Sequence, residues 1–156
     1  MSTSGGANAP EPSGPPEAQR PTTALYLDTS AVLRAVLESG TTPELERDIK
    51  NASVLLTSRL SRVEAARALL RLRALALASE EALADAAHEL DALWSRCDLW
   101  ELTPAVCELA SEVSPTKPLR TLDALHLSTY VVARRRIPGL ELRTTDTRLS
   151  DAARAP

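Results

Sequence analysis

Short apolar runs alternate with longer helical stretches along most of this chain, and this alternation limits the fold more than any other feature. Strands are expected at residues 24–27, 53–57, 99–102 and 140–144. The segments between them carry apolar residues at helical spacing or residues typical of helix starts. Because strands that alternate with helices usually build a parallel sheet with helices on both faces, the sequence predicts an α/β fold of that kind.

Capping residues mark where the helices should begin. Helices are expected at residues 31–38, from 43, from 58 or 61 to about 78, from 80 to about 97, from 104 to about 113, 121–136 and 147–153. Thr42 and Thr103 each precede a proline, Ser79 precedes two glutamates, and Thr121 is the expected cap of the helix that follows it. An edge where polar residues follow the strands is where parallel sheets bind their ligands.

The composition predicts one domain, at residues 23–156, behind a tail at residues 1–22. Five of the eleven prolines lie between Pro10 and Pro21, among Ser, Gly and Ala, so the tail is expected to be disordered. It has neither the basic start nor the apolar run of a secretory signal. No later stretch approaches the roughly 18 apolar residues of a membrane span, so no membrane association and a cytoplasmic location are expected.

Charge and cysteine content exclude several classes of protein. The net charge of −3 does not indicate a general nucleic-acid-binding protein, although sixteen of the eighteen basic residues are Arg, which suits contacts to phosphate or carboxylate. Cys97 and Cys107 are too few for a disulfide framework, and both fit apolar helical patterns as reduced core thiols. Together with His88 and His126 they lack the spacing of a zinc site.

Four acidic residues are expected at the same edge of the sheet. Asp28 ends the first strand, and Asp146 follows the last strand by two residues. Glu64 falls in the second turn of the helix after the second strand, and Asp123 in the first turn of the helix from Thr121. Because the carboxyl ends of parallel strands share one edge, these carboxylates should lie near one another although 118 positions separate the first from the last.

The neighbours of these acids favour a metal site. Asp28, Glu64 and Asp123 are flanked by Leu, Val or Ala, and a partly buried carboxylate needs a partner, a proton or a metal. Two carboxylates about 4 Å apart repel by roughly 4 kcal/mol at an effective dielectric constant of about 20. A divalent cation relieves this repulsion, and ligands that are all oxygen favour Mg²⁺ or Mn²⁺.

Each acid also has a structural alternative. Asp28 could cap the helix that follows it, and Glu64 could pair with Arg67 or Arg71 on its own helix. Asp123 could be an acid favoured by the helix dipole, and Asp146 could be a turn residue. Their joint occurrence at one edge favours the functional interpretation.

Four segments resemble the motifs of PIN-domain ribonucleases, most closely the VapC-type toxins of bacterial toxin–antitoxin pairs. The segments are Leu27-Asp28-Thr29-Ser30-Ala31, Glu64-Ala65-Ala66-Arg67-Ala68, residues 119–127 around Asp123, and Thr144-Thr145-Asp146-Thr147-Arg148-Leu149. The third is the most specific, and the resemblance covers about residues 24–153. The chain departs from the family in its Pro-rich tail and in the Arg134-Arg135-Arg136-Ile137-Pro138 segment.

The resemblance implies a three-layer α/β/α sandwich with a central, mainly parallel sheet. It implies a magnesium-dependent endoribonuclease, with Asp28, Glu64, Asp123 and Asp146 as catalytic metal ligands and Mn²⁺ as a substitute for Mg²⁺. It also implies a homodimer whose acidic groove is occupied by part of a cognate antitoxin. RNA would be hydrolysed by water that the metal activates.

Several other residues are secondary candidates. Thr29, Ser30 and Thr145 could orient ligands or water, or could only cap local turns. Arg34, Arg71 and Arg120 could neutralise RNA phosphates or pair with acids at the rim. His126 lies one helical turn after Asp123 and is expected to be a packed helix histidine rather than a ligand.

Two other functions compete with this interpretation. An aspartyl-phosphate phosphatase also places Asp after an apolar strand, but it needs a second Asp two residues later, where this chain has Ser30. A catalytically silent PIN-like binding module would be favoured by degenerate acids, and all four acids are present.

Overall fold

The computed structural model describes residues 23–114 and 116–154, and within them a four-stranded parallel sheet is the central element. The strands are β1 (Ala24–Leu27), β2 (Val54–Ser58), β3 (Cys97–Trp100) and β4 (Glu141–Arg143), in the order β3-β2-β1-β4. Each strand lies within two residues of its expected place. The expected tail at residues 1–22 lies outside the described residues.

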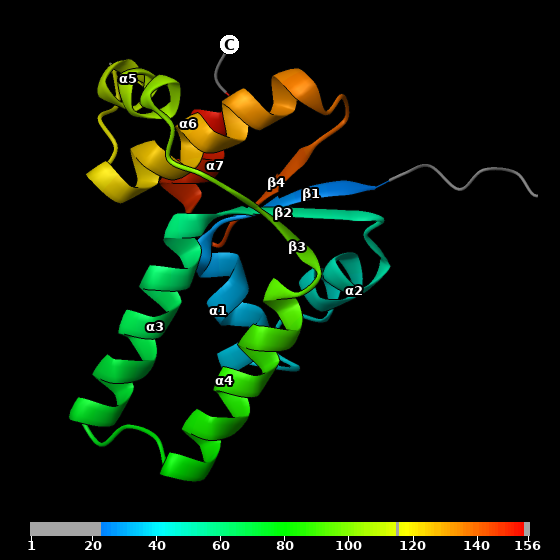
Figure 1. Cartoon of the computed structure of the whole chain (residues 1–156), viewed down its shortest axis with the longest axis vertical. Coiled ribbons are helices and arrows are strands. Elements are labelled where there is room, and N and C mark those ends of the chain that lie inside the picture. The colour runs from blue at the N-terminus through cyan, green and yellow to red at the C-terminus, as the bar shows by residue number, and fades with distance from the viewer. Residues whose placement is uncertain (1–22, 115, 155–156) are drawn as a thin grey trace, which may run out of the picture.

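Helices cover both faces of this sheet, as Figure 1 shows. One face carries α1 (Thr29–Leu37), α2 (Pro43–Asn51), α3 (Arg59–Ala74) and α4 (Glu80–Trp94), and the other carries α5 (Pro104–Glu112), α6 (Thr121–Arg136) and α7 (Thr147–Arg154). The predicted three-layer α/β/α architecture is therefore confirmed. Among the described residues, no helix is long and apolar enough to span a membrane.

The central strand β1 contributes to two separate apolar cores. Leu25 and Leu27 pack into the core beneath α1 and α4, whereas Ala24 and Tyr26 face the core beneath α6 and α7. All four side chains of this strand are buried. A strand buried on both faces holds the residue that follows it, Asp28, in a fixed position.

The strand register brings three chain segments to one edge of the sheet. Leu27 is paired with Thr57 on one side and with Arg143 on the other. The next residues, Asp28, Ser58 and Thr144, therefore emerge together at the carboxyl ends of β1, β2 and β4. This edge is where a parallel sheet binds its ligands.

Several local predictions were wrong. Thr121 does not cap α6; it is the first helical residue, the cap is Arg120, and no side chain bonds the free N–H groups there. Helix α3 ends at Ala74, because Ala76 adopts a left-handed conformation.

Both cysteines are free thiols, as predicted, but neither is a buried core residue of a helix. The helix α4 ends at Trp94, so Cys97 begins β3 and is only half-buried, while Cys107 is exposed on α5. Cys97 follows Trp94 by three residues, which is a helical spacing of apolar residues. The spacing therefore continued past the end of α4, and this is why the helix was predicted to reach Cys97.

Candidate active site

A pocket of about 550 Å³ lies at the carboxyl edge of the sheet, and all four predicted acids line it. Asp28 stands between β1 and α1, Glu64 lies on α3, Asp123 lies on α6, and Asp146 directly precedes α7. The rest of the wall is formed by hydroxyl, apolar and Arg side chains and one histidine: Thr29, Ser30, Leu33, Leu60, Val63, Arg67, Ala68, Arg71, Leu122 and His126. Four separate elements thus bring carboxylates to one place.

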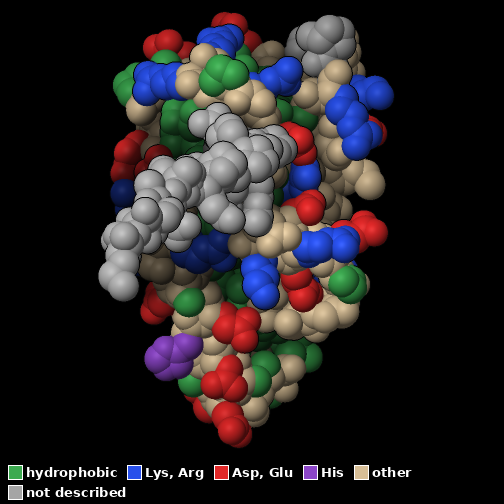
Figure 2. Space-filling view, turned by 90° about the vertical axis from the view of Figure 1, so that its right-hand side faces the viewer, with side chains coloured by type: hydrophobic (Ala, Val, Ile, Leu, Met, Phe, Trp, Pro, Cys, Tyr) green, Lys and Arg blue, Asp and Glu red, His purple; other side chains and the backbone are tan. Residues whose placement is uncertain are grey.

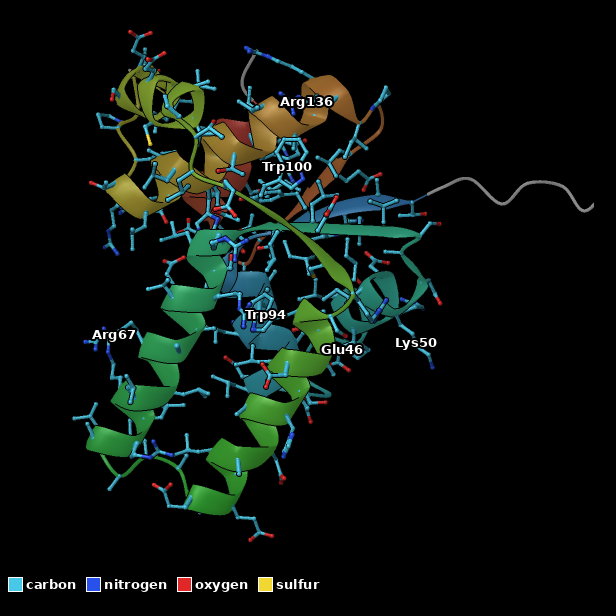
Figure 3. All side chains as sticks on the ribbon, in the orientation of Figure 1. Glu46, Lys50, Arg67, Trp94, Trp100 and Arg136 are labelled. Atoms are coloured by element: carbon cyan, nitrogen blue, oxygen red, sulfur yellow. The ribbon has the colours of Figure 1, made fainter. Side chains whose placement is uncertain are left out.

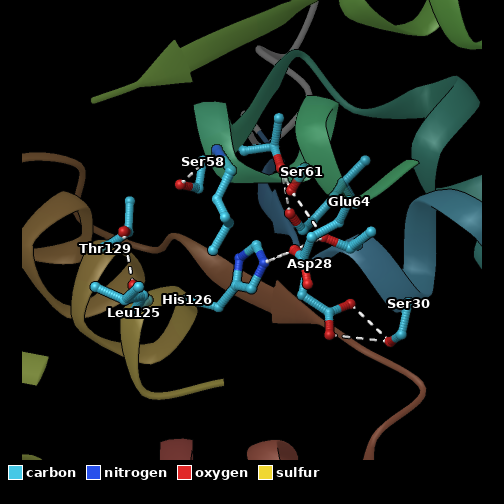
Figure 4. Close-up of polar contacts among 12 residues, drawn as sticks. Asp28, Ser30, Ser58, Ser61, Glu64, Leu125, His126 and Thr129 are labelled. Carbon is cyan, nitrogen blue, oxygen red and sulfur yellow. Dashed lines mark hydrogen bonds and ion pairs between the residues drawn. The ribbon is translucent and has the colours of Figure 1, made fainter. Parts of the chain in front are cut away.

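Asp28 is both a helix cap and a wall of this pocket. It is 5% exposed, and its Oδ1 accepts hydrogen bonds from the Ala31 backbone N–H at 2.9 Å and the Ser30 hydroxyl at 2.8 Å. Its Oδ2 accepts from the Thr144 hydroxyl at 2.8 Å. The expected capping role is therefore real, and it fixes the carboxylate at the pocket (Figure 4). Burial raises the pKa of Asp28 although these bonds oppose the shift.

Glu64 bonds to His126 and Thr29 rather than to an arginine. Its Oε2 lies 2.7 Å from His126 Nε2 and accepts a hydrogen bond from the Thr29 hydroxyl (Figure 4). The alternative pairing with Arg67 or Arg71 was wrong, because the described ion pairs give Glu64 only His126. Burial raises the pKa of Glu64, but the bonds from His126 and Thr29 outweigh burial, so the pKa is lowered overall.

His126 links this carboxylate to the core. It is 3% exposed, and its Nδ1 lies 3.1 Å from the Tyr26 hydroxyl. Because a carboxylate only accepts hydrogen bonds, His126 Nε2 carries a proton and donates it to Glu64. Burial raises the pKa of Tyr26 far above its ordinary value, so the phenol keeps its proton.

Asp123 and Asp146 form the more open part of the pocket. Both are half-buried, and among the described residues Asp123 makes no hydrogen bond. Asp146 caps α7 through Oδ1, which accepts from the backbone N–H groups of Arg148 at 2.7 Å and Leu149 at 3.2 Å. Burial and then the negative charge of Asp146 raise the pKa of Asp123, whereas His126 and Arg120 oppose the shift. Repulsion between carboxylates is thus present here.

The donor chemistry of the pocket fits a hard divalent cation. Carboxylates and hydroxyls supply only oxygen, and their mutual repulsion is the charge imbalance that such an ion would relieve. Within residues 23–114 and 116–154, however, no three His, Cys, Asp or Glu side chains are positioned to hold one ion together. Helix capping by Asp28 and Asp146 and the bond of Glu64 to His126 hold these side chains in their present rotamers.

The secondary candidates divide into two groups. Thr29 and Ser30 contact the acids directly, whereas Thr145 is exposed and only its backbone N–H reaches Ser30, at 2.8 Å. Arg120 acts on Asp123 through its charge. Arg71 lines the pocket, and Arg34 instead pairs with Glu38 at 3.0 Å.

Sequence reasoning missed three contributions to the site. Thr144, not Thr145, bonds to Asp28, because the pairing of Leu27 with Arg143 places the next residues together. Ser61 connects Thr29 to Thr57, at 3.3 Å and 2.7 Å. His126 was expected to be packed, which is right, but its bond to Glu64 was not anticipated; the spacing of three residues after Asp123, on one helix face, was the available signal.

A parallel α/β/α sandwich with four acids at the carboxyl edge defines a class of protein, and the comparisons identify the family. The model of the PIN domain family matches residues 25–155. Ribonuclease VapC46 of Mycobacterium tuberculosis is 33% identical over 132 residues, which cover 84% of this chain and 91% of that relative. Ribonuclease VapC35 of the same species is 32% identical over 133 residues, covering 84% and 90%. The chain therefore belongs to the PIN domain family, in the branch of the VapC proteins.

Solved structures share this fold. A protein from Pyrobaculum aerophilum, PAE2754, superposes with a TM-score of 0.62 at 22% identity, covering 85% of this chain and 81% of that chain. The toxin–antitoxin complex from Klebsiella pneumoniae gives a TM-score of 0.55 at 20% identity, covering 80% and 88%. VapBC2 from Rickettsia felis, crystallised with promoter DNA, gives 0.52 at 17% identity, covering 78% and 99%.

Proposed function

We propose that this protein is a magnesium-dependent endoribonuclease that acts as the toxin of a toxin–antitoxin pair. The observation that carries the proposal is the pocket in which Asp28, Glu64, Asp123 and Asp146 meet from four different elements. The relatives named ribonuclease VapC, each covered over at least 90% of its length, support hydrolysis of RNA as the reaction.

The chain's own residues divide the work of the reaction. Asp28 and Glu64 are held by neighbouring hydroxyls and by His126, which fix the two carboxylates at the wall of the pocket. Asp123 is free to turn toward a ligand, because among the described residues no hydrogen bond restrains it. Arg67 and Arg71 line the same pocket and are suited to contact phosphate oxygens.

A magnesium ion would be held by Asp28, Glu64 and Asp123, with Asp146 binding directly or through water, and Mn²⁺ would substitute. When bound, such an ion activates an attacking water and stabilises the negative charge that develops on the phosphoryl and leaving oxygens. Cleavage should leave a 5′-phosphate and a free 3′-hydroxyl.

The proposal includes the partners of the protein. The structures of toxin–antitoxin complexes with this fold support a cognate antitoxin as partner. We further propose a homodimer that acts in the cytoplasm and is held inactive by that antitoxin.

The test is cleavage of single-stranded RNA by the purified protein. We expect cleavage with Mg²⁺ or Mn²⁺ and complete arrest by excess EDTA, reversed when Mg²⁺ is restored. Cleavage that continues unchanged in EDTA would contradict a metal-dependent mechanism. A protein that cleaves RNA with neither Mg²⁺ nor Mn²⁺ would contradict the nuclease assignment.

A further inference from the structure

The carboxyl-terminal end of α6 carries three consecutive arginines that the proposed active site does not use. Arg134, Arg135 and Arg136 fill the last turn of this helix, and all three are exposed. In the part of the chain that the structure describes, none of them forms an ion pair. The helix dipole favours cations at this end, but it does not balance three neighbouring charges that repel one another.

These arginines point to different parts of the surface. Arg134 lines a groove beside β4, whereas Arg136 lies over the ring of Trp100 on β3, with its guanidinium carbon 5.6 Å from the ring centroid. Figure 3 shows Trp100 and Arg136 side by side. Figure 2 shows Lys and Arg side chains along the top of the face that it draws, with Asp and Glu side chains among them. The helix end thus offers several cations at once.

A groove runs from this basic end along β4, toward the edge of the sheet where the acidic pocket lies. It measures about 1240 Å³ and is lined by parts of α6, β4 and α7, including Arg134 and Arg154. Along β4 it follows the chain from Gly139 to Arg143. The next residue, Thr144, bonds to Asp28, so the end of the groove at Arg143 is one residue away from a partner of the carboxylates. A tight turn joins α6 to β4 and brings the arginines beside that strand. The Leu140 N–H donates to the Ile137 C=O across this turn, and Gly139 within it has a positive φ.

The distribution of charge over the groove and the pocket indicates which ligand they would bind. The pocket itself presents four carboxylates and the chain carries a net charge of −3, so the reaction site repels a phosphate backbone. Arg67 and Arg71 line the pocket as well, but they stand against four carboxylates, so most of the affinity for a polyanion must come from cations outside the pocket. Arginine is suited to this role because its planar fork can bind a phosphate through two hydrogen bonds.

We propose that Arg134, Arg135 and Arg154 form a second contact surface for single-stranded RNA, which binds the phosphate backbone of substrate whose reacting bond lies in the acidic pocket. The proposal rests on the proposed function. The helix α6 has 16 residues and a length of about 24 Å, so the surface contacts only RNA that extends well beyond the bond to be cleaved.

The test measures RNA binding in a background that cannot cleave. Asp123→Asn serves as that background, and Arg134→Ala with Arg135→Ala removes two cations of the surface. The matched control removes Arg47 and Lys50, two exposed cations of α2 on the other face of the sheet. Both pairs lower the net charge equally, and a melting curve verifies that each variant is folded.

We expect the α6 pair to weaken binding of a single-stranded RNA of about 16 nucleotides roughly tenfold at about 0.1 M salt. The slope of log affinity against log salt should fall by about 1.4, which is two phosphate contacts at about 0.7 each. A variant that carries Arg134→Lys and Arg135→Lys keeps both positive charges and should therefore keep most of this salt dependence. An RNA of about 4 nucleotides is too short to reach from the pocket to the α6 surface, so it should bind equally to all variants.

The inference is wrong if the α6 pair binds the RNA as tightly as the background protein does, or if the α2 control pair loses as much RNA affinity. Binding of polyglutamate, an acidic polypeptide, is measured in parallel. If the α6 pair loses affinity for polyglutamate but not for RNA, the surface binds protein instead. The proposed function fails separately. If the wild-type protein cleaves RNA but the α6 pair binds RNA normally, only this inference fails. If the wild-type protein never cleaves RNA but the α6 pair loses binding, only the nuclease assignment fails.

Discussion

The two sides of the acidic pocket differ in how their carboxylates are held. On the buried side, Asp28 and Glu64 accept hydrogen bonds from hydroxyls, a backbone N–H and His126. On the open side, Asp123 has no hydrogen bond among the described residues, and Asp146 uses one oxygen to cap α7. The buried side is thus part of the folded framework, whereas on the open side the charge is available to a ligand.

This difference separates two kinds of contribution to the same site. Neutralising an acid of the buried side disturbs a network that reaches through Ser61 to β2 and through Tyr26 to the core. Neutralising Asp123 removes mainly a charge whose neighbours raise its pKa. We therefore expect removal of a hydrogen-bonding side chain on the buried side, as in Asp28→Ala, to lower stability and activity together, whereas a change on the open side should lower mainly activity.

The largest effect is expected from Asp123→Asn. Since Asp123 is a proposed metal ligand without a structural bond, RNA cleavage should fall by more than about a hundredfold, which exceeds the usual cost of disturbing a ligand's supporting residues. The melting temperature without metal should be unchanged or slightly higher, because a repelling charge has been removed. Normal cleavage by this variant would remove Asp123 from the catalytic set.

On the buried side, the cap at Asp28 should be visible in stability. Asp28→Ala should be less stable than Asp28→Asn by about 0.5 to 2 kcal/mol, because Asn can still accept the Ala31 N–H and Ala cannot. Both variants should lose cleavage. Urea unfolding at neutral pH measures the difference, and equal stability of the two variants would show that the cap contributes nothing.

A smaller effect is the pH dependence of stability at Glu64. Because its folded pKa is lowered, the charged form stabilises the fold above the ordinary glutamate pKa, and this contribution is lost as the pH falls through the folded value. Wild type should therefore exceed Glu64→Gln in stability at pH 7, and the gap should close below about pH 4.

Asp28 should show the opposite sign. Its raised pKa means that the folded protein binds the proton more tightly than the unfolded chain, so the charged form lowers stability above that pKa. Any advantage of Asp28→Asn over wild type at pH 7 should shrink as the pH falls. Parallel pH profiles for the two carboxylates would contradict the described networks.

The sequence alone predicts the layers and the shared edge, because both follow from the alternation of strands and helices. It also gives the cap as one of two alternative roles of Asp28, since a cap needs only its own helix. The strand order is a property of pairing between distant segments, so Thr144 could not be identified as the partner of Asp28. The same limit hid the bond between Glu64 and His126, which joins residues 62 positions apart. Neither α3 nor α6 alone contains this contact.

Local periodicity also failed where one element passes directly into another. Cys97 continues the apolar spacing of α4, but the chain has already entered β3, and the burial of Cys97 depends on that strand. At α6, Thr121 is a favoured capping residue, yet the helix begins one residue earlier than that preference indicates and Arg120 occupies the cap.

The central claim is that the four acids bind one divalent centre together, and magnesium-linked thermal stabilisation tests it most directly. Melting curves with and without Mg²⁺ would be recorded for wild type and for Asp28→Asn, Glu64→Gln, Asp123→Asn and Asp146→Asn. A ligand that binds only the folded state raises stability with the logarithm of its saturation. We predict a rise in the melting temperature of wild type and a smaller rise in every variant, including the open-side pair. An equal rise in wild type and all four variants would contradict the account.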